Sequence, residues 1–545
     1  MIKKSGVKRA LTVILAGVAA ISLVGCNNDT PATTQGGTSD GSIDLTEYTV
    51  VYAAQGSSGY ASKAKELASF LGVESQADKT AEGAYPDNGD KEIVIGNTNR
   101  KESEDARATL KEKSDKKHAY GIVVTQNRVA IVGTSSQAII EAINIVMTDC
   151  TSNKLLTIPL GQSIFGEFAS DPVKVSSTLT LIPTALSTIA KAPKNSWGGG
   201  IGTPSVIDLQ HNGDNNGMLI ASYAVGDSGM TGKPTSLRTA RSKDGGKTWE
   251  LSGRAYEEVD KSIEASWNPH LFELPCKVGD MPEGTLLLAG ISIDAGQDKK
   301  TAVNIWRSYD LGESWEHYLV LDTGAVGTTT GGLYEPYLMY ENEKLYCFYS
   351  DETDKEEHSQ KLVFKTSSDG VNWSEKKEMV ALEDQTERPG MAVIAKMGNG
   401  KYFGIYEVCS DLPDKGATLY YKITDDLDHW DPTDKGTCLT AKDGSTFGSA
   451  PWCAWSPVGG DCGMLIISST YGTENNDLVV SLDYGKTFTT IENPLPYKEG
   501  GYSASLFFSS DGKTLFYSNT VELEANSEKA RVDFVALELR YTPKS

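Results

Sequence analysis

The stretch Ser242-Lys243-Asp244-Gly245-Gly246-Lys247-Thr248-Trp249 follows the pattern Ser-x-Asp-x-Gly-x-Thr/Ser-Trp/Phe, which returns at residues 308–315 and 481–488. Versions that are one residue shorter occur at 367–373 and 424–430, and a degenerate copy lies near 509–512. The five better copies begin at intervals of 66, 59, 57 and 57 residues. This period suits a four-stranded propeller blade with long loops better than a helical repeat. The repeat therefore predicts a β-propeller.

Each position of the repeat suits a tight turn between two strands. Asp accepts hydrogen bonds from backbone N–H groups, Gly adopts the positive φ that the turn needs, and Ser or Thr adds a local side-chain bond. The closing Trp offers an apolar face to a neighbouring sheet. In this form the motif resembles the Asp-box of the sialidase-type propeller superfamily, in which it is structural and lies away from the active site. We therefore leave these residues out of the candidate catalytic set.

The N-terminus carries the pattern of an exported lipoprotein. In residues 1–26, basic side chains precede an apolar run at 10–24, and Leu23-Val24-Gly25-Cys26 resembles a bacterial lipobox. The apolar run is too short to span a membrane stably. We expect Cys26 to become the lipidated N-terminus, with residues 27–44 as a flexible linker. The protein is then expected on the extracellular face of a bacterial membrane, held only by its lipid anchor.

The charge and the cysteine and histidine content exclude several classes of partner. The net charge is −22 and no basic stripe is present, so a nucleic acid partner is not expected. The other seven cysteines form no CxxC pair, and none of the six histidines has ligand spacing. We therefore expect no metal and no cofactor. Cys453 and Cys462 either pair locally or stay as buried free thiols, and the protein is expected to be a monomer.

Residues 45–168 alternate between strand and helix patterns, which predicts a small α/β accessory domain. Strands are expected at 48–52 and 92–96, helices at 61–71 and 136–147, and a hairpin at 120–132. The segments Glu92–Arg100 and Ala119–Val124 resemble a small α/β domain that precedes the catalytic domain in several glycosidase families. The turn at 96–99 lacks the glycine spacing and the lysine of a phosphate loop, so nucleotide binding is not expected.

Residues 170–545 are predicted to form a six-bladed propeller that makes the protein mostly β. The strand at 173–181 has no repeat motif of its own and is expected to join the last blade, which removes the free edge. The six blades are expected at 197–255, 263–322, 330–383, 386–440, 446–494 and 500–541.

The active site of a propeller is expected where the innermost strands converge. A proline begins five of the expected inner strands, in Thr203-Pro204, Asn268-Pro269, Glu335-Pro336, Arg388-Pro389 and Ala450-Pro451. Proline is tolerated at the start of a strand and extends the residue before it. The residues before these prolines are therefore candidates to line the mouth, and Glu335 and Arg388 are the charged ones among them.

Two glutamates have the surroundings that glycosidase chemistry needs. Glu335 lies between aromatic residues, and the resulting desolvation raises a carboxyl pKa and suits it to general-acid work. Glu407 ends the apolar strand that begins at Lys401, where an unpartnered carboxylate is costly. Retaining hydrolysis uses one protonated and one ionised carboxyl group about 5–5.5 Å apart.

A more specific resemblance then emerges from five short segments that occur in a fixed order. They are Tyr334-Glu335-Pro336-Tyr337, Tyr349-Ser350-Asp351-Glu352, Gln360–Val363, Arg388–Met391 and Tyr406-Glu407. In this order they resemble glycoside hydrolase family 93, the exo-α-1,5-L-arabinanases, over about residues 195–520. The resemblance implies a six-bladed propeller that releases arabinobiose with retention, with Glu335 as acid/base and Glu407 as nucleophile.

The remaining candidate residues are substrate ligands. Arg388 is expected to hold Glu407 in its ionised form or to bind a sugar hydroxyl. Asp351, Gln360, His358 and Asn268 are candidates for hydrogen bonds to sugar hydroxyls. The aromatic candidates for stacking on furanose rings are Tyr334, Tyr337, Tyr406 and Trp452.

Two other functions fit a propeller of this kind. A sialidase needs a cluster of arginines for the sugar carboxylate, but the place of the first one reads Ile201-Gly202-Thr203-Pro204. A glycan-binding surface lipoprotein needs no catalytic pair, because a fold does not determine a function. The presence of both glutamates favours an enzyme over this second alternative.

Overall fold

The computed structural model describes residues 43–543, with gaps at 55–57, 81–82, 85–89, 115–117, 149, 169, 171, 193–200, 226–235, 256–262, 295–299, 326–330, 411–415, 471–476, 496–501 and 522–529. The chain divides into two compact units at the Phe168–Ala169 bond. Cys26 and its lipobox lie outside the described residues, so lipidation stays a prediction. None of the helices in the described part combines the length and apolar character needed to cross a bilayer.

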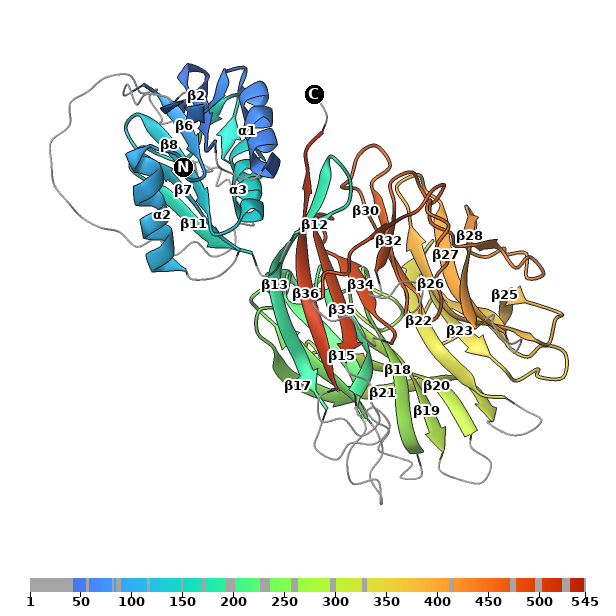
Figure 1. The fold of residues 1–545 in the computed structure, drawn as a ribbon. Coiled ribbons are helices and arrows are strands. Elements are labelled where there is room, and N and C mark those ends of the chain that lie inside the picture. The colour runs from blue at the N-terminus through green and yellow to red at the C-terminus, as the bar shows by residue number, and fades with distance from the viewer. Residues whose placement is uncertain are drawn as a thin grey trace, which may run out of the picture. The chain divides into compact units, whose positions relative to one another are not determined.

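The N-terminal unit is built on a six-stranded mixed sheet in the order β11-β7-β8-β6-β2-β3 (Figure 1). Strands β8, β6, β2 and β3 are parallel, and β7 is antiparallel to both of its neighbours. The elements are β1 (Ile43–Asp44), η1 (Leu45–Glu47), β2 (Thr49–Tyr52), α1 (Ser58–Leu71), β3 (Ser75–Ala77), β4 (Lys79–Thr80), β5 (Gly83–Ala84), β6 (Glu92–Ile95), α2 (Lys101–Lys113), β7 (Ala119–Val124), β8 (Arg128–Gly133), α3 (Ser136–Thr148), β9 (Thr151–Ser152), β10 (Leu155–Leu156) and β11 (Ser163–Glu167). The predicted α/β fold of this unit is confirmed.

The segment that follows β6 serves the structure of this unit. Nε and Nη2 of Arg100 each donate to one oxygen of Glu92 at 2.8 Å, and Nε of Arg128 adds a bond of 3.0 Å. All three side chains are buried. Because loss of one partner leaves a buried charge uncompensated, this network ties α2 to the sheet. Helix α2 itself was not predicted, since Ala106 and Leu110 are its only buried apolar residues in a highly charged segment.

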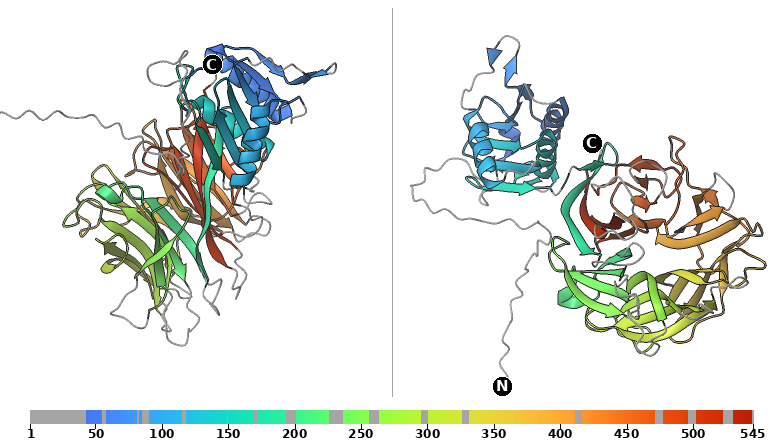
Figure 2. Two further views of the ribbon diagram at one scale, coloured as in Figure 1. Left: turned by 90° about the vertical axis from the view of Figure 1, so that its left-hand side faces the viewer. Right: turned by 60° about the horizontal axis from the view of Figure 1, so that its bottom comes forward.

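The second unit consists of six antiparallel sheets that follow one another around a ring, from green to red in Figure 2. The first five blades each have four strands in chain order. Their strands are β14 (Ile201–Asp208), β15 (Leu219–Val225), β16 (Ser236–Ser242), β17 (Glu250–Ala255); β18 (Ile263–Glu273), β19 (Leu286–Asp294), β20 (Lys300–Ser308), β21 (Glu316–Ala325); β22 (Leu333–Glu341), β23 (Lys344–Asp351), β24 (Lys361–Ser367), β25 (Lys377–Ala381); β26 (Glu387–Lys396), β27 (Tyr402–Ser410), β28 (Ala417–Thr424), β29 (Thr437–Cys438); and β30 (Trp452–Ser456), β31 (Met464–Ser468), β32 (Leu478–Ser481), β33 (Thr489–Ile491). A short 3₁₀ helix, η2 (Gly213–Asn215), follows β14. The predicted propeller is confirmed.

The sixth blade joins the two ends of the propeller unit. Its strands β34 (Ser505–Phe508), β35 (Thr514–Val521) and β36 (Arg531–Tyr541) continue into β13 (Leu179–Lys191) and β12 (Val173–Lys174). The strand predicted at 173–181 is therefore two strands, and the longer one pairs with β36 as expected. This pairing closes the ring and leaves no open junction between the first and last blades.

The Asp-box at Ser242–Trp249 fills the turn between the third and fourth strands of its blade. Asp244 accepts bonds from the backbone N–H and the hydroxyl of Thr248, and the Ser242 hydroxyl accepts from Gly246 N. The Trp249 ring packs edge-on against Phe534 of the preceding blade. The copies at 308–315 and 481–488 have the same bonds. The degenerate copy near 509–512 instead lies between β34 and β35, and is not equivalent to the others.

Hydrogen bonds link the inner strands of neighbouring blades at all six junctions. Each joins a side chain of one inner strand to the backbone of the next, or the reverse. The pairs are Val206 N to Ser505 Oγ, Leu271 N to Ser205 Oγ, Leu338 N to His270 Nδ1, Tyr337 Oη to Ile394 O, Cys453 Sγ to Val393 O and Trp452 Nε1 to Leu506 O. Apolar clusters fill the same junctions between the sheets. Together these contacts fix the axis around which the site is built.

Asp208, at the end of β14, is a buried carboxyl group whose Oδ1 has no hydrogen-bond partner among the described residues. Burial raises its pKa to about 6. A raised pKa in the folded state makes the protein lose stability as pH rises from about 4 to about 6, and the loss persists above that range. We expect Asp208→Asn to raise the free energy of unfolding at pH 7.5 by about 1–2 kcal/mol and to give no gain at pH 4.

The measurement is chemical denaturation followed by tryptophan fluorescence. All nine tryptophans belong to the propeller unit, so this signal reports on it alone. Asp214→Asn, at an exposed position in η2, is the matched control and should change neither midpoint. A stabilisation by Asp208→Asn that is equal at both pH values would contradict the explanation by burial of the charge.

Candidate active site

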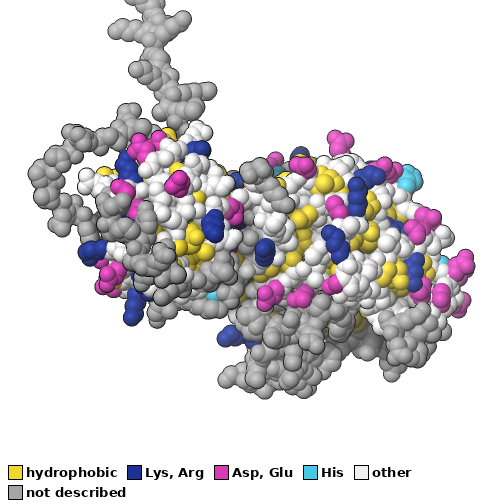
Figure 3. All heavy atoms as spheres, turned by 45° about the horizontal axis from the view of Figure 1, so that its top comes forward, with side chains coloured by type: hydrophobic (Ala, Val, Ile, Leu, Met, Phe, Trp, Pro, Cys, Tyr) yellow, Lys and Arg dark blue, Asp and Glu magenta, His cyan; other side chains and the backbone are white. Residues whose placement is uncertain are grey.

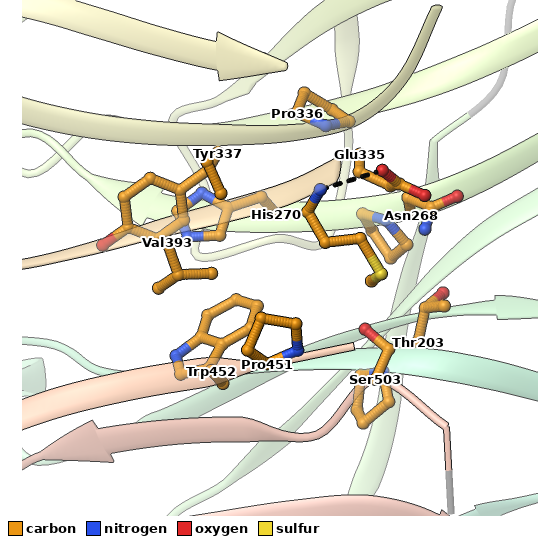
Figure 4. A pocket seen from close by; sticks show the side chains of 14 residues that line it. Thr203, Asn268, His270, Glu335, Pro336, Tyr337, Val393, Pro451, Trp452 and Ser503 are labelled. Carbon is orange, nitrogen blue, oxygen red and sulfur yellow. Dashed lines mark hydrogen bonds between the residues drawn. The ribbon is translucent and has the colours of Figure 1, made fainter. Parts of the chain in front are cut away.

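The inner strands of the six blades enclose a pocket at the propeller axis, with an empty volume of about 400 Å³ (Figure 4). Fourteen residues line it, and every blade contributes at least one. They are Thr203, Pro204, Asn268, Pro269, His270, Glu335, Pro336, Tyr337, Met391, Ala392, Val393, Pro451, Trp452 and Ser503. The structure therefore places Glu335, Tyr337, Trp452 and Asn268 of the predicted site at one pocket.

Each blade has a backbone irregularity at the level of this pocket, which is a bulge within β14, β18, β22 and β26 and lies just before β30 and β34 in the other two blades. At this level each blade has a non-glycine residue with a φ between 45° and 60°; these residues are Thr203, Asn268, Glu335, Met391, Ala450 and Ser503. This conformation costs roughly 1–2 kcal/mol per residue, so six of them at one level mark a functional part of the fold. A proline follows in four of the six, as predicted.

The fourth blade departs from the predicted alignment. Arg388-Pro389 lies in regular pairing with Cys409 and Val408, and the bulge comes later, between Gly390 and Val393. Met391, and not Arg388, is therefore the residue equivalent to Glu335. The error arose because the bulge of this blade is followed by Ala392, which carries no proline to mark it.

Glu335 is held by its neighbours in the third and fourth blades. Its Oε2 accepts a bond of 2.7 Å from the Ser350 hydroxyl and one of 3.2 Å from the Met391 amide, shown as a dashed line in Figure 4. Burial, followed by the negative charge of Glu407, raises the pKa of Glu335 to about 7. Near neutral pH this carboxyl group is therefore able to act first as a proton donor and then as a base.

Glu407 is held in the corresponding way one blade further on. It is 8 % exposed, and its Oε2 accepts a bond of 2.8 Å from the Ala450 amide. Met391 and Ala450 both have the positive φ described above, so each carboxylate is bound by the backbone N–H of the corresponding residue in the next blade. Hydrogen bonds of this kind favour the ionised form of a carboxyl group.

Gly390 lies in a crowded place beside Glu335. It is the cross-strand partner of Glu407, and a Cβ added to it would lie 3.6 Å from Glu335 Oε2 and only 2.7 Å from Gln360 Nε2. A side chain at this position would collide with Gln360 and contact Glu335. Glu335 lines the pocket, and Glu407, which is not among the fourteen lining residues, lies close enough for its charge to act on Glu335. Two neighbouring carboxyl groups are what glycoside hydrolysis uses.

Arg388 has different partners from those we expected. Its Nη2 donates to Glu352 Oε1 at 2.5 Å and to Gln360 Oε1 at 2.6 Å, and no bond to Glu407 is present among the described residues. Gln360 also donates to the Pro389 carbonyl at 2.8 Å. Gln360 therefore positions Arg388, while the guanidinium remains 35 % exposed and available to a ligand.

Two of the predicted substrate ligands belong to the interior of the protein. Tyr406 is fully buried and its hydroxyl donates to the Lys435 carbonyl at 2.7 Å, so stacking on a sugar is excluded. Because side chains alternate along a strand, Tyr406 faces away from the site that Glu407 faces. Asp351 is 1 % exposed and binds Thr353 and Lys376, which makes it part of the loop structure and not a sugar ligand.

The aromatic residues at the pocket form its floor. The rings of His270, Tyr337 and Trp452 form one cluster, with centroids 4.4 Å (His270–Tyr337), 5.5 Å (His270–Trp452) and 6.0 Å (Tyr337–Trp452) apart. Burial lowers the pKa of His270 to about 3, so this ring is neutral and serves the contact between blades described above. Tyr337 and Trp452 also bind neighbouring backbone carbonyls, which leaves their ring faces as the part available to a ligand. Tyr334 is half-buried and does not line the pocket.

His358 is a loop residue away from the pocket lining. Its Nδ1 donates to the Leu382 carbonyl at 2.8 Å. It lies close to Asp354 and Glu357, with one ligand atom of each within 4.8 Å of the others. Asp354 already binds Lys361 at 2.9 Å, and exposed acidic groups of this kind are common without an ion, so we assign no metal to it. Cys453 and Cys462 are both free thiols.

Sequence reasoning missed the groups that hold the two carboxylates. Ser350 and the amides of Met391 and Ala450 carry no motif, because a backbone N–H has no sequence signal apart from the bulge that exposes it. Only the position of Ser350 could have indicated it, because Ser350 is the cross-strand partner of Tyr334, the residue before Glu335. Thr203 and Ser503 line the far side of the pocket and were recognised only as positions at the mouth.

Comparison with solved structures finds proteins that resemble the propeller. One is an alpha-L-arabinanase of Penicillium chrysogenum in complex with arabinobiose, 29% identical, with a TM-score of 0.58. Another is an alpha-L-arabinofuranosidase of glycoside hydrolase family 93 from Fusarium graminearum, also with arabinobiose, 26% identical and with a TM-score of 0.58. Each match covers 65% of this chain and 98% of the other. No protein-family model matches the chain, and no curated protein sequence does. The predicted resemblance to the arabinan-active enzymes of family 93 is confirmed.

Proposed function

We propose that this protein is a retaining glycoside hydrolase that acts on arabinan, as an exo-α-1,5-L-arabinanase that releases arabinobiose. The observation that carries the proposal is the pair Glu335 and Glu407, whose charges act on each other and whose carboxyl groups are bound by the amides of Met391 and Ala450 in successive blades. The likeness to two enzymes solved with arabinobiose supports the choice of sugar. As an exported lipoprotein anchored at Cys26, the enzyme would meet its polysaccharide outside the cell.

The two carboxyl groups divide the reaction between them. Glu407 attacks the anomeric carbon while Glu335 gives its proton to the departing glycosidic oxygen, which forms a covalent glycosyl-enzyme. Glu335, now ionised, then takes a proton from water, whose oxygen attacks the same carbon and frees Glu407. Two inversions leave the anomeric configuration unchanged. Arg388, partly exposed beside the pair, is placed to bind a sugar hydroxyl.

The structure gives little support to sialidase chemistry. No arginine is found among the described residues that line the pocket, and Thr203 and Pro204 occupy the place of the first one. A planar carboxylate is best bound by several guanidinium groups, so a sialoside has no matching site here. On the face in Figure 3, acidic and basic side chains of the described residues are interspersed, and the overall charge of −22 disfavours anionic polymers.

Incubation with linear α-1,5-arabinan tests the proposal, with a sialoside as the comparison substrate. We expect arabinobiose as the first product, detected by anion-exchange chromatography, and its initial anomer to be α by NMR. No sialic acid should be released. Binding of arabinan without turnover would point to a glycan-binding protein instead, and release from the sialoside alone would overturn the proposal.

A further inference from the structure

Cys409 lies beside the proposed nucleophile. It follows Glu407 by two residues on β27, so both side chains are on the same face of the strand. The Cys409 thiol donates to Glu407 Oε1 across 3.4 Å, while the Ala450 amide binds Oε2 of the same carboxylate. Each oxygen of Glu407 therefore has one donor, and the carboxyl plane is fixed by a contact on either side.

The surroundings of this thiol keep it protonated. Cys409 is half-buried and is the cross-strand partner of Arg388, and the charged groups that act on it are Glu407, Arg388 and Glu335. Burial, followed by the negative charge of Glu407, raises the pKa of the thiol to about 12. A protonated thiol is a hydrogen-bond donor, whereas a thiolate would repel the carboxylate.

We propose that Cys409 is a positioning residue that holds the Glu407 carboxylate in the orientation from which it attacks the sugar. The role rests on the function proposed above. A thiol is a weak donor, so it restrains rotation of the carboxylate while leaving most of the charge on Oε1 available for attack. A hydroxyl or ammonium donor in the same place would bind Oε1 more strongly and lower its nucleophilicity. The residue acts on the reaction through Glu407 and does not itself contact the reacting atoms.

Kinetics of Cys409→Ala and Cys409→Ser on arabinan test this role. We expect Cys409→Ala to lower kcat by about tenfold, with KM changed less than about twofold, because a transition-state contact is weakened. Loss of a donor to the Glu407 carboxylate should move the acid limb of the pH–activity profile to higher pH. Cys409→Ser supplies a stronger donor, so it should return the acid limb to its wild-type position or below it while kcat stays lowered. If Cys409→Ala lowered the thermal stability but left the acid limb of the pH–activity profile in place, the thiol would only fill space.

Alkylation by iodoacetamide tests the contact independently of any activity. Peptide mass spectrometry follows the modification of Cys409, with the partly exposed Cys438 as internal reference. Because Glu407 raises the pKa of the thiol, Glu407→Gln should speed alkylation of Cys409 at pH 8 by about threefold or more and leave Cys438 unchanged. Equal alkylation rates of Cys409 in the wild type and in Glu407→Gln would show that the thiol does not contact Glu407. Faster alkylation in Glu407→Gln together with a wild type that is inactive on arabinan would retain the contact and reject the proposed function.

Discussion

Replacement of Glu335 by glutamine is expected to lower kcat on linear arabinan by roughly 10³-fold, which is within the range for loss of a general acid. Glutamine keeps the shape of the side chain and an oxygen that accepts from Ser350 and Met391, so the loss reports on the missing proton. With an aryl arabinobioside, whose phenolate leaves without protonation, the same replacement should lower the rate of the first step, formation of the glycosyl-enzyme, far less. The two substrates are compared by pre-steady-state kinetics.

The same carboxyl group determines the alkaline limb of the pH profile. The raised pKa of about 7 means that Glu335 carries its proton below that pH and loses it above. Activity of the wild type on arabinan should therefore fall as pH rises through about 7, and this limb should be absent from Glu335→Gln. Glu341→Gln, at the other end of β22 and paired with Lys396, is the matched control and should keep full activity. Equal losses on both substrates would show that Glu335 is not the proton donor.

The propeller could be predicted from the sequence because its turns repeat. Asp244 and its equivalents accept hydrogen bonds from the corresponding N–H groups in each copy of the turn. The same residue types therefore recur in the sequence at each copy. Glu335 was found in a similar way, since the proline after it marks the bulge. The closing strand was found because a propeller cannot leave its first edge unpaired.

The errors arose where a position depends on strand register. Arg388 was aligned with Glu335 through its proline, but the register places the bulge at Met391. Tyr406 was predicted to be a sugar ligand, although the alternation of side chains along a strand places it on the opposite face from Glu407. Whether the bulge falls before or after a given residue depends on contacts between blades, and these are not visible in any local pattern. The amides that hold the carboxylates follow from that register and were missed with it.

Replacement of Glu407 by alanine is expected to lower kcat by about 10⁴-fold or more, because no covalent intermediate can then form. Small anions can occupy the space that the side chain leaves. Azide should therefore restore turnover of an activated aryl arabinobioside, by direct attack from the face that Glu407 occupied. The product expected from this single inversion is a β-configured glycosyl azide, which NMR identifies.

Glu335→Ala with azide supplies the mirror experiment, and the two products assign the roles within the pair. Here the nucleophile is intact, the glycosyl-enzyme forms from the activated substrate, and azide replaces the water that Glu335 would have activated. Two inversions give an α-configured azide. This division of roles is the one proposed above, and the raised pKa of Glu335, about 7, supports it as the proton donor. If Glu335→Ala gave the β product and Glu407→Ala the α product, the two roles would be reversed.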